Sequence, residues 1–124
     1  MPVFERPGTS GSKIKVEDRY GHYIGGEFVP PIKGEYFDNY APQTGQVFTQ
    51  VGRGTAEDIE AALDAAHNAA DSWGRTSATD RSNILLKIAD VMEANLEDIA
   101  VIESWDNGKA CLLYTSDAAD EGLG

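Results

Sequence analysis

Few residues of this chain have types and spacings that could perform chemistry. It holds one cysteine, Cys111, and two histidines, His22 and His67, which lie far apart in the sequence. A cysteine thiolate is a good nucleophile, but its reactivity depends on a microenvironment that nothing around Cys111 specifies. Neither histidine has a Cys or a second His at the spacing of a metal site, so both are expected to be ordinary surface or hydrogen-bonded side chains. The sequence therefore predicts no catalytic residue.

The segment Gly52-Arg53-Gly54 resembles a dinucleotide-binding loop, because it follows a predicted strand and precedes a predicted helix. The third glycine of the G-x-G-x-x-G pattern is missing, and Glu57 stands in its place. Glu57 and Asp58 also bring negative charge to the helix N-terminus, where a bound pyrophosphate would lie. These residues favour helix capping, and no cofactor-binding residue is predicted.

The elements that would position these residues begin with short strands between Tyr20 and Val51. Tyr23-Ile24 and Glu27-Phe28-Val29 flank Gly25-Gly26, a pair that supplies the positive φ of a hairpin turn. Three further segments follow: a strand at residues 35–39, a type I turn at 42–45 and a strand at 47–51. A sheet with so few strands is not stable by itself. This region therefore needs other elements to cover it.

After Gly54 the spacing of the apolar residues becomes helical and predicts three helices. Their predicted capping residues are Thr55 with Asp58, Ser77 with Asp80, and Asn95. The third helix is expected to run to about Asp106, with Gly108 as its C-terminal glycine. Each helix carries one apolar stripe that something must cover. Four carboxylates lie beside the first stripe: Glu57, Asp58, Glu60 and Asp64. Paired carboxylates can act in acid–base catalysis, but here their position favours a solvent-exposed face of the helix.

The composition excludes several classes of function. With 21 Asp plus Glu against 10 Lys plus Arg, the formal charge is −11, which is unlike the basic face of a nucleic-acid-binding protein. No apolar run has the length of a membrane span, and the N-terminus lacks the apolar region of a secretory signal. One cysteine cannot form an internal disulfide, so a reducing cytoplasmic setting is expected.

Five segments, in order, resemble the opening of the aldehyde dehydrogenase superfamily. They are residues 23–28 (YIGGEF), 39–47 (NYAPQTGQV, with Ala41 where Asn is usual), 55–73, 81–90 and 103–109 (ESWDNGK). The resemblance runs from about Tyr20 to Lys109 with its spacing intact. Within the superfamily, the chain looks most like the bacterial acetaldehyde dehydrogenase group.

The resemblance implies an α/β parent fold with a Rossmann-type coenzyme domain, to which this chain contributes N-terminal β-hairpins followed by three helices. It also implies oxidation of a small-molecule aldehyde to a carboxylic acid with NAD or NADP, through a Cys thioester, in a cytoplasmic homodimer or homotetramer. The family's catalytic Cys, Glu and Asn and its coenzyme-binding segments come later in the sequence. This fragment is therefore expected to be inactive.

A monovalent cation site is also implied by the resemblance. In parts of the family, the Asp of the third-helix segment and main-chain carbonyls beside the N-P-x-T-G turn bind such an ion. Here these positions are Asp106 and Asn39 or Tyr40, and oxygen donors suit a hard cation. A helix-end role for Asp106 is the alternative, and the site would lack ligands from beyond residue 110.

The resemblance breaks at Ala110, where the family has Pro. Residues 111–121 (CLLYTSDAADE) resemble, residue for residue, the read-through translation of a transposase adapter used to prepare sequencing libraries. We therefore expect three parts: a flexible leader at 1–19, an incomplete N-terminal part of the coenzyme-binding domain at 20–110, and a non-native read-through at 111–124, of which residues 122–124 have no explanation. Segments of such origin do not enter fold or function reasoning.

A free-standing helical interaction module without catalysis is the alternative function. In both cases the helices present apolar faces that no coenzyme domain of this chain covers, so we expect the chain to be marginally stable and prone to associate.

Overall fold

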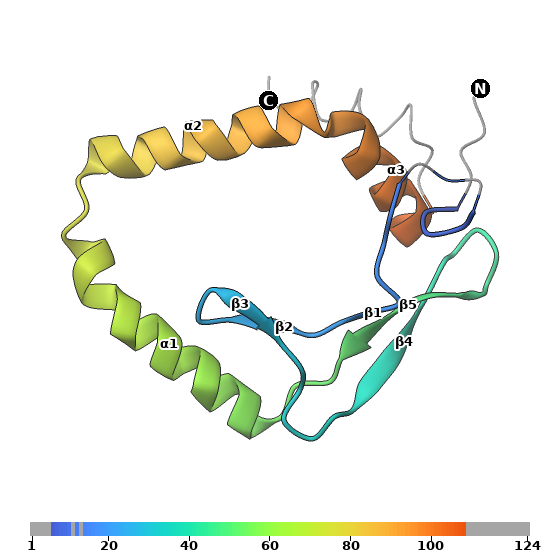
Figure 1. The fold of residues 1–124 in the computed structure, drawn as a ribbon, viewed down its shortest axis with the longest axis horizontal. Helices are drawn as coiled ribbons and strands as arrows, with labels where there is room; N and C mark the ends of the chain where they lie inside the picture. Colours follow the sequence, from blue (N-terminus) through green and yellow to red (C-terminus); the bar gives the residue numbers. More distant parts are fainter. Residues whose placement is uncertain (1–5, 11, 13, 109–124) are drawn as a thin grey trace.

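The computed structural model describes residues 6–10, 12 and 14–108. Its elements are β1 (Arg19–Tyr20), β2 (His22–Ile24), β3 (Glu27–Val29), β4 (Tyr36–Tyr40), β5 (Val47–Gly52), α1 (Ala56–Gly74), α2 (Ala78–Ala94) and α3 (Leu96–Asn107). Short strands followed by three helices were predicted, and this order is confirmed (Figure 1).

The strands form two separate sheets. One has the order β1-β5-β4, with β1 parallel and β4 antiparallel to β5, and the other is the β2–β3 hairpin. In the hairpin Ile24 pairs with Glu27, and Gly25 and Gly26 take φ values of 65° and 89°. Only glycine adopts such values at no steric cost, so the predicted hairpin turn is confirmed.

The turn between β4 and β5 starts one residue earlier than predicted. The Ala41 carbonyl accepts hydrogen bonds from the N–H groups of Thr44 (3.2 Å) and Gly45 (2.8 Å), and Gly45 has φ of 68°. Just before the turn, the register between the strands shifts so that Tyr40 faces Val47.

The described part of the predicted leader contacts this bulge. The Arg6 guanidinium donates to the carbonyls of Val47 (2.8 Å) and Phe48 (3.1 Å), and Pro7 is fully buried. Arg6 also lies over the Phe48 ring, 5.8 Å from its centroid. The flexibility predicted for residues 1–19 as a whole stays a prediction, and residues 111–124 lie outside the described part of the chain.

The three helices begin where the capping residues indicated. Ser77 accepts from the Asp80 N–H at 3.1 Å, and Gly108 ends α3 with φ of 79°. Asn95 occupies the predicted position, but its side chain does not cap α3. It donates instead to the Val91 carbonyl at the end of α2 (2.8 Å), because one residue joins the two helices and the last turn of α2 leaves its carbonyls without helical partners.

The buried apolar residues gather where α3 meets the β4–β5 turn. Among the described residues, and leaving prolines aside, they are Ala41, Phe48, Ala100 and Val101. Figure 1 shows α1 and α2 as two arms, α2 extending from α3 and α1 from the end of β5, with a short linker joining their far ends and the β2–β3 hairpin beside α1. The alanines of α1 allow close packing against another element, and in this structure Ala62 and Ala65 are half-buried on a helix that contacts β2.

Candidate functional site

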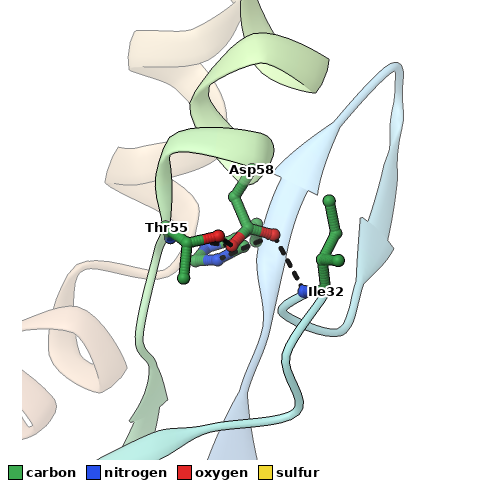
Figure 2. A network of polar contacts seen from close by, with 4 residues as sticks. Ile32, Thr55 and Asp58 are labelled. Carbon is green, nitrogen blue, oxygen red and sulfur yellow. Dashed lines mark hydrogen bonds and ion pairs between the residues drawn. The ribbon is translucent and has the colours of Figure 1, made fainter.

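Asp58, at the start of α1, is the centre of a polar network that ties three segments together. Its Oδ2 accepts from the N–H (2.8 Å) and the hydroxyl (3.0 Å) of Thr55, and its Oδ1 accepts from the N–H of Ile32 (2.9 Å), as Figure 2 shows. The carboxylate is buried. One side chain therefore caps α1 and also holds the loop that follows β3.

These bonds change the acidity of Asp58. The Thr55 N–H and then the Ile32 N–H hold the pKa of Asp58 below its ordinary value, against the opposing effect of burial. The Thr55 hydroxyl and the nearby His22 act in the same direction with smaller effect. Asp58 is therefore an ionised, fully engaged carboxylate at neutral pH, which is the opposite of what a general acid needs.

His22 lies beside Asp58, with its Nε2 3.8 Å from Asp58 Oδ1. The two glycines of the loop-like segment face its ring: a Cβ on Gly52 would lie 3.4 Å from Cε1, and one on Gly54 3.6 Å. A Cβ on Gly52 would also press on Pro31 at 3.2 Å. These glycines therefore accommodate the imidazole and a proline, and Asp58 occupies the helix N-terminus where a phosphate would lie. The capping interpretation is confirmed.

A shallow hollow of about 390 Å³ adjoins this network. Its polar groups are those of His22, Asp58 and Tyr23, and its remaining lining is aliphatic or glycine. Both Asp58 oxygens accept hydrogen bonds from the chain itself, so the carboxylate is held in place by Thr55 and Ile32, whereas the buried His22 Nε2 makes no hydrogen bond to any described residue. The pair is a structural junction between the β2–β3 hairpin and α1.

The predicted cation residues lie at the other end of the molecule, where β4 meets the C-terminus of α3. Asn39 Nδ2 donates to Asp106 Oδ1 at 2.7 Å, so these two predicted residues are brought together. Gln43 Nε2 donates to the Ser104 carbonyl at 3.0 Å and joins the β4–β5 turn to α3. Tyr40 directly follows Asn39 at the β-bulge and is 56% exposed.

The oxygen-bearing side chains and main-chain carbonyls of the predicted residues are of the chemical type that binds a monovalent cation. Asp106 offers carboxylate oxygens and contacts the Asn39 side chain, and oxygen donors are what hard cations prefer. The Asn39 amide donates to Asp106 Oδ1, so Asp106 also joins α3 to β4; the cation site and the alternative helix-end role of Asp106 both stay predictions. Within the described ranges, no group of three or more His, Cys, Asp or Glu side chains could hold a metal ion.

The remaining candidates fall outside any site. His67 and the carboxylates Glu57, Glu60 and Asp64 are exposed on α1. Cys111 lies outside the residues that the structure describes. No helix in the described part of the chain is both long and apolar enough to span a membrane.

Sequence reasoning missed the long-range half of the Asp58 network. The capping-box spacing predicted the bond to Thr55, but the bond to Ile32 spans 26 residues and leaves no local pattern. The two prolines before Ile32 favour the end of a strand and carry no sign of this bond. A non-helical loop next to a helix N-terminus was the available clue, since such loops carry main-chain N–H groups without partners.

A model of the aldehyde dehydrogenase family matches residues 28–120. That range extends past Ala110 into the predicted adapter segment, whose boundary stays a prediction. An aldehyde dehydrogenase of Deinococcus radiodurans is 64% identical over 106 residues, which cover 86% of this chain and 21% of that protein. An acetaldehyde dehydrogenase of Pseudomonas aeruginosa is 62% identical over 108 residues, 87% of this chain and 21% of that protein.

A solved structure agrees with these sequence relatives. The NAD⁺ complex of an aldehyde dehydrogenase from Bacillus cereus has a TM-score of 0.75 and 36% sequence identity, over 80% of this chain and 21% of that one. The chain thus spans about a fifth of the length of the relatives it matches. Its strands and helices correspond to part of the aldehyde dehydrogenase fold, and the chain belongs to the aldehyde dehydrogenase family.

Proposed function

We propose that this chain is the N-terminal segment of an NAD(P)-dependent enzyme that oxidises a small-molecule aldehyde to a carboxylic acid through a Cys thioester. The observation that carries the proposal is the family match over residues 28–120, in a chain that spans about a fifth of its relatives. The NAD⁺-bound relative from Bacillus cereus supports a nicotinamide cofactor.

Within that enzyme, the role of this segment is structural. Asp58, the best-placed carboxylate among the described residues, is engaged by its own chain. Neither a nucleophile nor a coenzyme-binding residue is assigned to residues 20–110, so the chain alone is proposed to be inactive. The parent is proposed to be a cytoplasmic homodimer or homotetramer.

The decisive experiment recovers the complete reading frame from the source DNA. We expect it to continue past Lys109 with Pro and later a Cys-containing motif, and the full-length product to form NADH or NADPH from an aldehyde, measured at 340 nm. A full-length product that leaves both coenzymes oxidised with short- and long-chain aldehydes would contradict the enzyme proposal. Genomic sequence that continues in frame for many codons past Glu121 would contradict the adapter hypothesis.

A second candidate function is a free-standing helical interaction module, which the exposed apolar faces of α1 and α2 favour. The same reading frame separates the two candidates, because a native stop codon near Lys109 supports the module. A companion measurement titrates the chain with NAD⁺ by calorimetry. We expect no heat of binding, whereas saturable binding would place a coenzyme site within this segment.

We assign Asp106, with the carbonyl of Asn39 or Tyr40, to a monovalent cation site of the parent enzyme. The 2.7 Å contact between Asn39 and Asp106 supports this assignment. In the full-length enzyme, Asp106→Asn should abolish the rise in melting temperature that KCl produces over choline chloride. Asp98→Asn, an exposed carboxylate of the same helix, is the matched control and should keep that rise.

A further inference from the structure

An asparagine–glycine pair stands at the C-terminus of α3. Asn107 is the only asparagine of the chain that is followed by glycine, whereas the other four precede Tyr, Ala, Ile or Leu. In such a pair the main-chain nitrogen of the glycine can attack the side-chain amide carbon of the asparagine, because glycine has no Cβ that would hinder ring closure. Asn107 and Gly108 are both exposed, so water reaches the pair.

The reaction that this pair can undergo is deamidation. The Gly108 nitrogen forms a bond to Asn107 Cγ, and the side-chain nitrogen leaves as ammonia with the proton that the Gly108 nitrogen gives up. Water then opens the resulting succinimide at either of its two carbonyls and leaves an aspartate or an isoaspartate at position 107. The only co-reactant is therefore water.

The folded end of α3 keeps the two reacting groups apart. Helical side chains lean toward the N-terminus of their helix, and Asn107 Nδ2 accordingly donates to Glu103 Oε1, one turn back, at 3.2 Å. The Gly108 N–H donates to the Ser104 carbonyl at 2.9 Å. The amide carbon is thus turned back along α3 while the attacking nitrogen is held in the helix cap. Ring closure therefore requires the last turn of α3 to open.

The turn between β4 and β5 holds this helix end closed at two points. The Ser104 carbonyl, which binds the Gly108 N–H, also accepts a hydrogen bond from Gln43 Nε2 at 3.0 Å. Pro42 lies beside Gly108, because a Cβ on that glycine would come within 3.2 Å of Pro42 Cβ. These contacts join described residues to one another, so they do not depend on what covers α1 or α2.

We propose that Asn107 is a site of spontaneous deamidation, and that the β4–β5 turn sets its rate by holding the end of α3 closed. The observed rate is then the rate of the open form multiplied by its population. A carboxylate at position 107 no longer donates to Glu103 and repels it, and an isoaspartate also lengthens the main chain by one carbon. Deamidation therefore loosens the junction between α3 and the β4–β5 turn. The site does not depend on the proposed enzymatic function.

Mass spectrometry of the 124-residue chain, incubated in mildly alkaline buffer, tests the site. In urea, where the chain is unfolded, Asn107 should lose ammonia and gain water while the other four asparagines stay largely unchanged. Without urea the conversion should be at least about tenfold slower, because the end of α3 must first open. Asn107→Gln should abolish it, since a glutamine would have to close a larger ring.

Two outcomes of this experiment would overturn the proposal. A chain that keeps its Asn107 amide in urea has no deamidation site there. A chain that converts equally fast with and without urea is not protected by its fold, so the contacts of Gln43 and Pro42 would have no effect on the rate.

Substitution in the β4–β5 turn tests what holds the helix end closed. Gln43→Ala should raise the rate in the folded chain by about fivefold, as expected for the loss of one hydrogen bond of ordinary net strength. Gln46→Ala, the same change at an exposed residue of the same turn, leaves the bond to Ser104 in place and should change the rate by less than about twofold. Equal acceleration by the two substitutions would overturn control by the Gln43 contact.

Hydrogen exchange at the Gly108 amide measures the opening directly. Exchange and ring closure both require the Gly108 N–H to leave the Ser104 carbonyl, so Gln43→Ala should speed exchange and deamidation by the same factor. The amide of Val101, a buried residue earlier in α3, should exchange as in the parent chain. Faster deamidation without faster exchange at Gly108, or equal acceleration at Val101, would overturn the proposal, because the opening would then not be that of the helix end.

Discussion

Two regions of this molecule contrast in how their helices are held: the end of the fold where α3 lies, and the end formed by the arms α1 and α2. At one end α3 buries Ala100 and Val101 to 2% and 1% exposure against the β4–β5 turn. At the other end α2 buries nothing, although its apolar stripe is the more regular of the two. The amphipathic pattern of a helix therefore indicates that it has a contact face, whereas the burial of its side chains shows which contacts the described residues make.

The anchored end also has the longer-range polar contacts. Asn39 reaches Asp106 over 67 residues, and Gln43 reaches the Ser104 carbonyl over 61. Apart from the Asp58–Ile32 bond at the start of α1, which spans 26 residues, the bonds along α1 and α2 are local, such as the capping bond of Ser77 and an exposed ion pair between Arg75 and Asp71 at 3.8 Å. Exposed pairs of that kind contribute little to stability, so the difference in stability between the two ends should be large.

The largest effect is expected from a charge placed in the anchored core. Val101→Asp should unfold the α3 end, because an unpaired carboxylate at a buried position costs several kcal/mol, about 3 or more. Leu86→Asp on α2 is the control and should cost less than about 0.5 kcal/mol. Urea denaturation followed by circular dichroism measures both. Similar midpoints for the two variants would mean that the ends do not differ as described.

A smaller effect is expected from glycine substitution at the same two ends. Gly108 ends α3 with φ of 79°, and a Cβ there would lie 3.2 Å from Pro42 Cβ. Gly108→Ala should therefore cost about 1–2 kcal/mol. Gly74 ends α1 at an ordinary φ with nothing within 4 Å of an added Cβ, so Gly74→Ala should stabilise the chain by about 0.5 kcal/mol. Opposite shifts of the urea midpoint confirm the comparison, and shifts of the same sign contradict it.

The sequence predicted the elements better than their contacts, for a physical reason. The turn at Gly25-Gly26 and the caps at Ser77 and Gly108 depend on neighbouring residues, so their patterns are local and the predictions held. Asn95 is the exception, because the side chain had a competing acceptor in the Val91 carbonyl of the preceding helix. Which stripe is buried depends on the rest of the fold, which residues 6–108 represent only in part.

The same distinction applies to the candidate site. The resemblance placed Asn39 and Asp106 in one site, although they lie 67 residues apart and composition or spacing alone would not have joined them. No sequence pattern predicted the hydrogen bond from the Ile32 N–H to Asp58, because a main-chain donor does not depend on the type of the residue. The spacing of Gly52 and Gly54 resembles a phosphate-binding loop. In the structure, however, the His22 ring lies against both glycines, so they accommodate a side chain of the chain itself.

The smallest predicted effect concerns pH at the junction between the hairpin and α1. Because the folded chain holds the pKa of Asp58 below its ordinary value, the ionised carboxylate stabilises the fold above the unfolded pKa of about 3.9, and this contribution is lost as pH falls through the folded pKa. Asp58→Asn lacks the contribution at every pH. The difference in urea midpoint between the parent chain and Asp58→Asn should therefore be constant above about pH 5 and shrink below about pH 4.

Asp64→Asn is the matched control for this pH series. It removes a carboxylate from the same helix but leaves the bonds of Asp58 to Thr55 and Ile32 in place. If Asp58 acts through those bonds, amide exchange at Ile32 should speed up in Asp58→Asn and stay unchanged in Asp64→Asn. An equal response of the two variants would mean that helix charge, and not the junction, stabilises the start of α1.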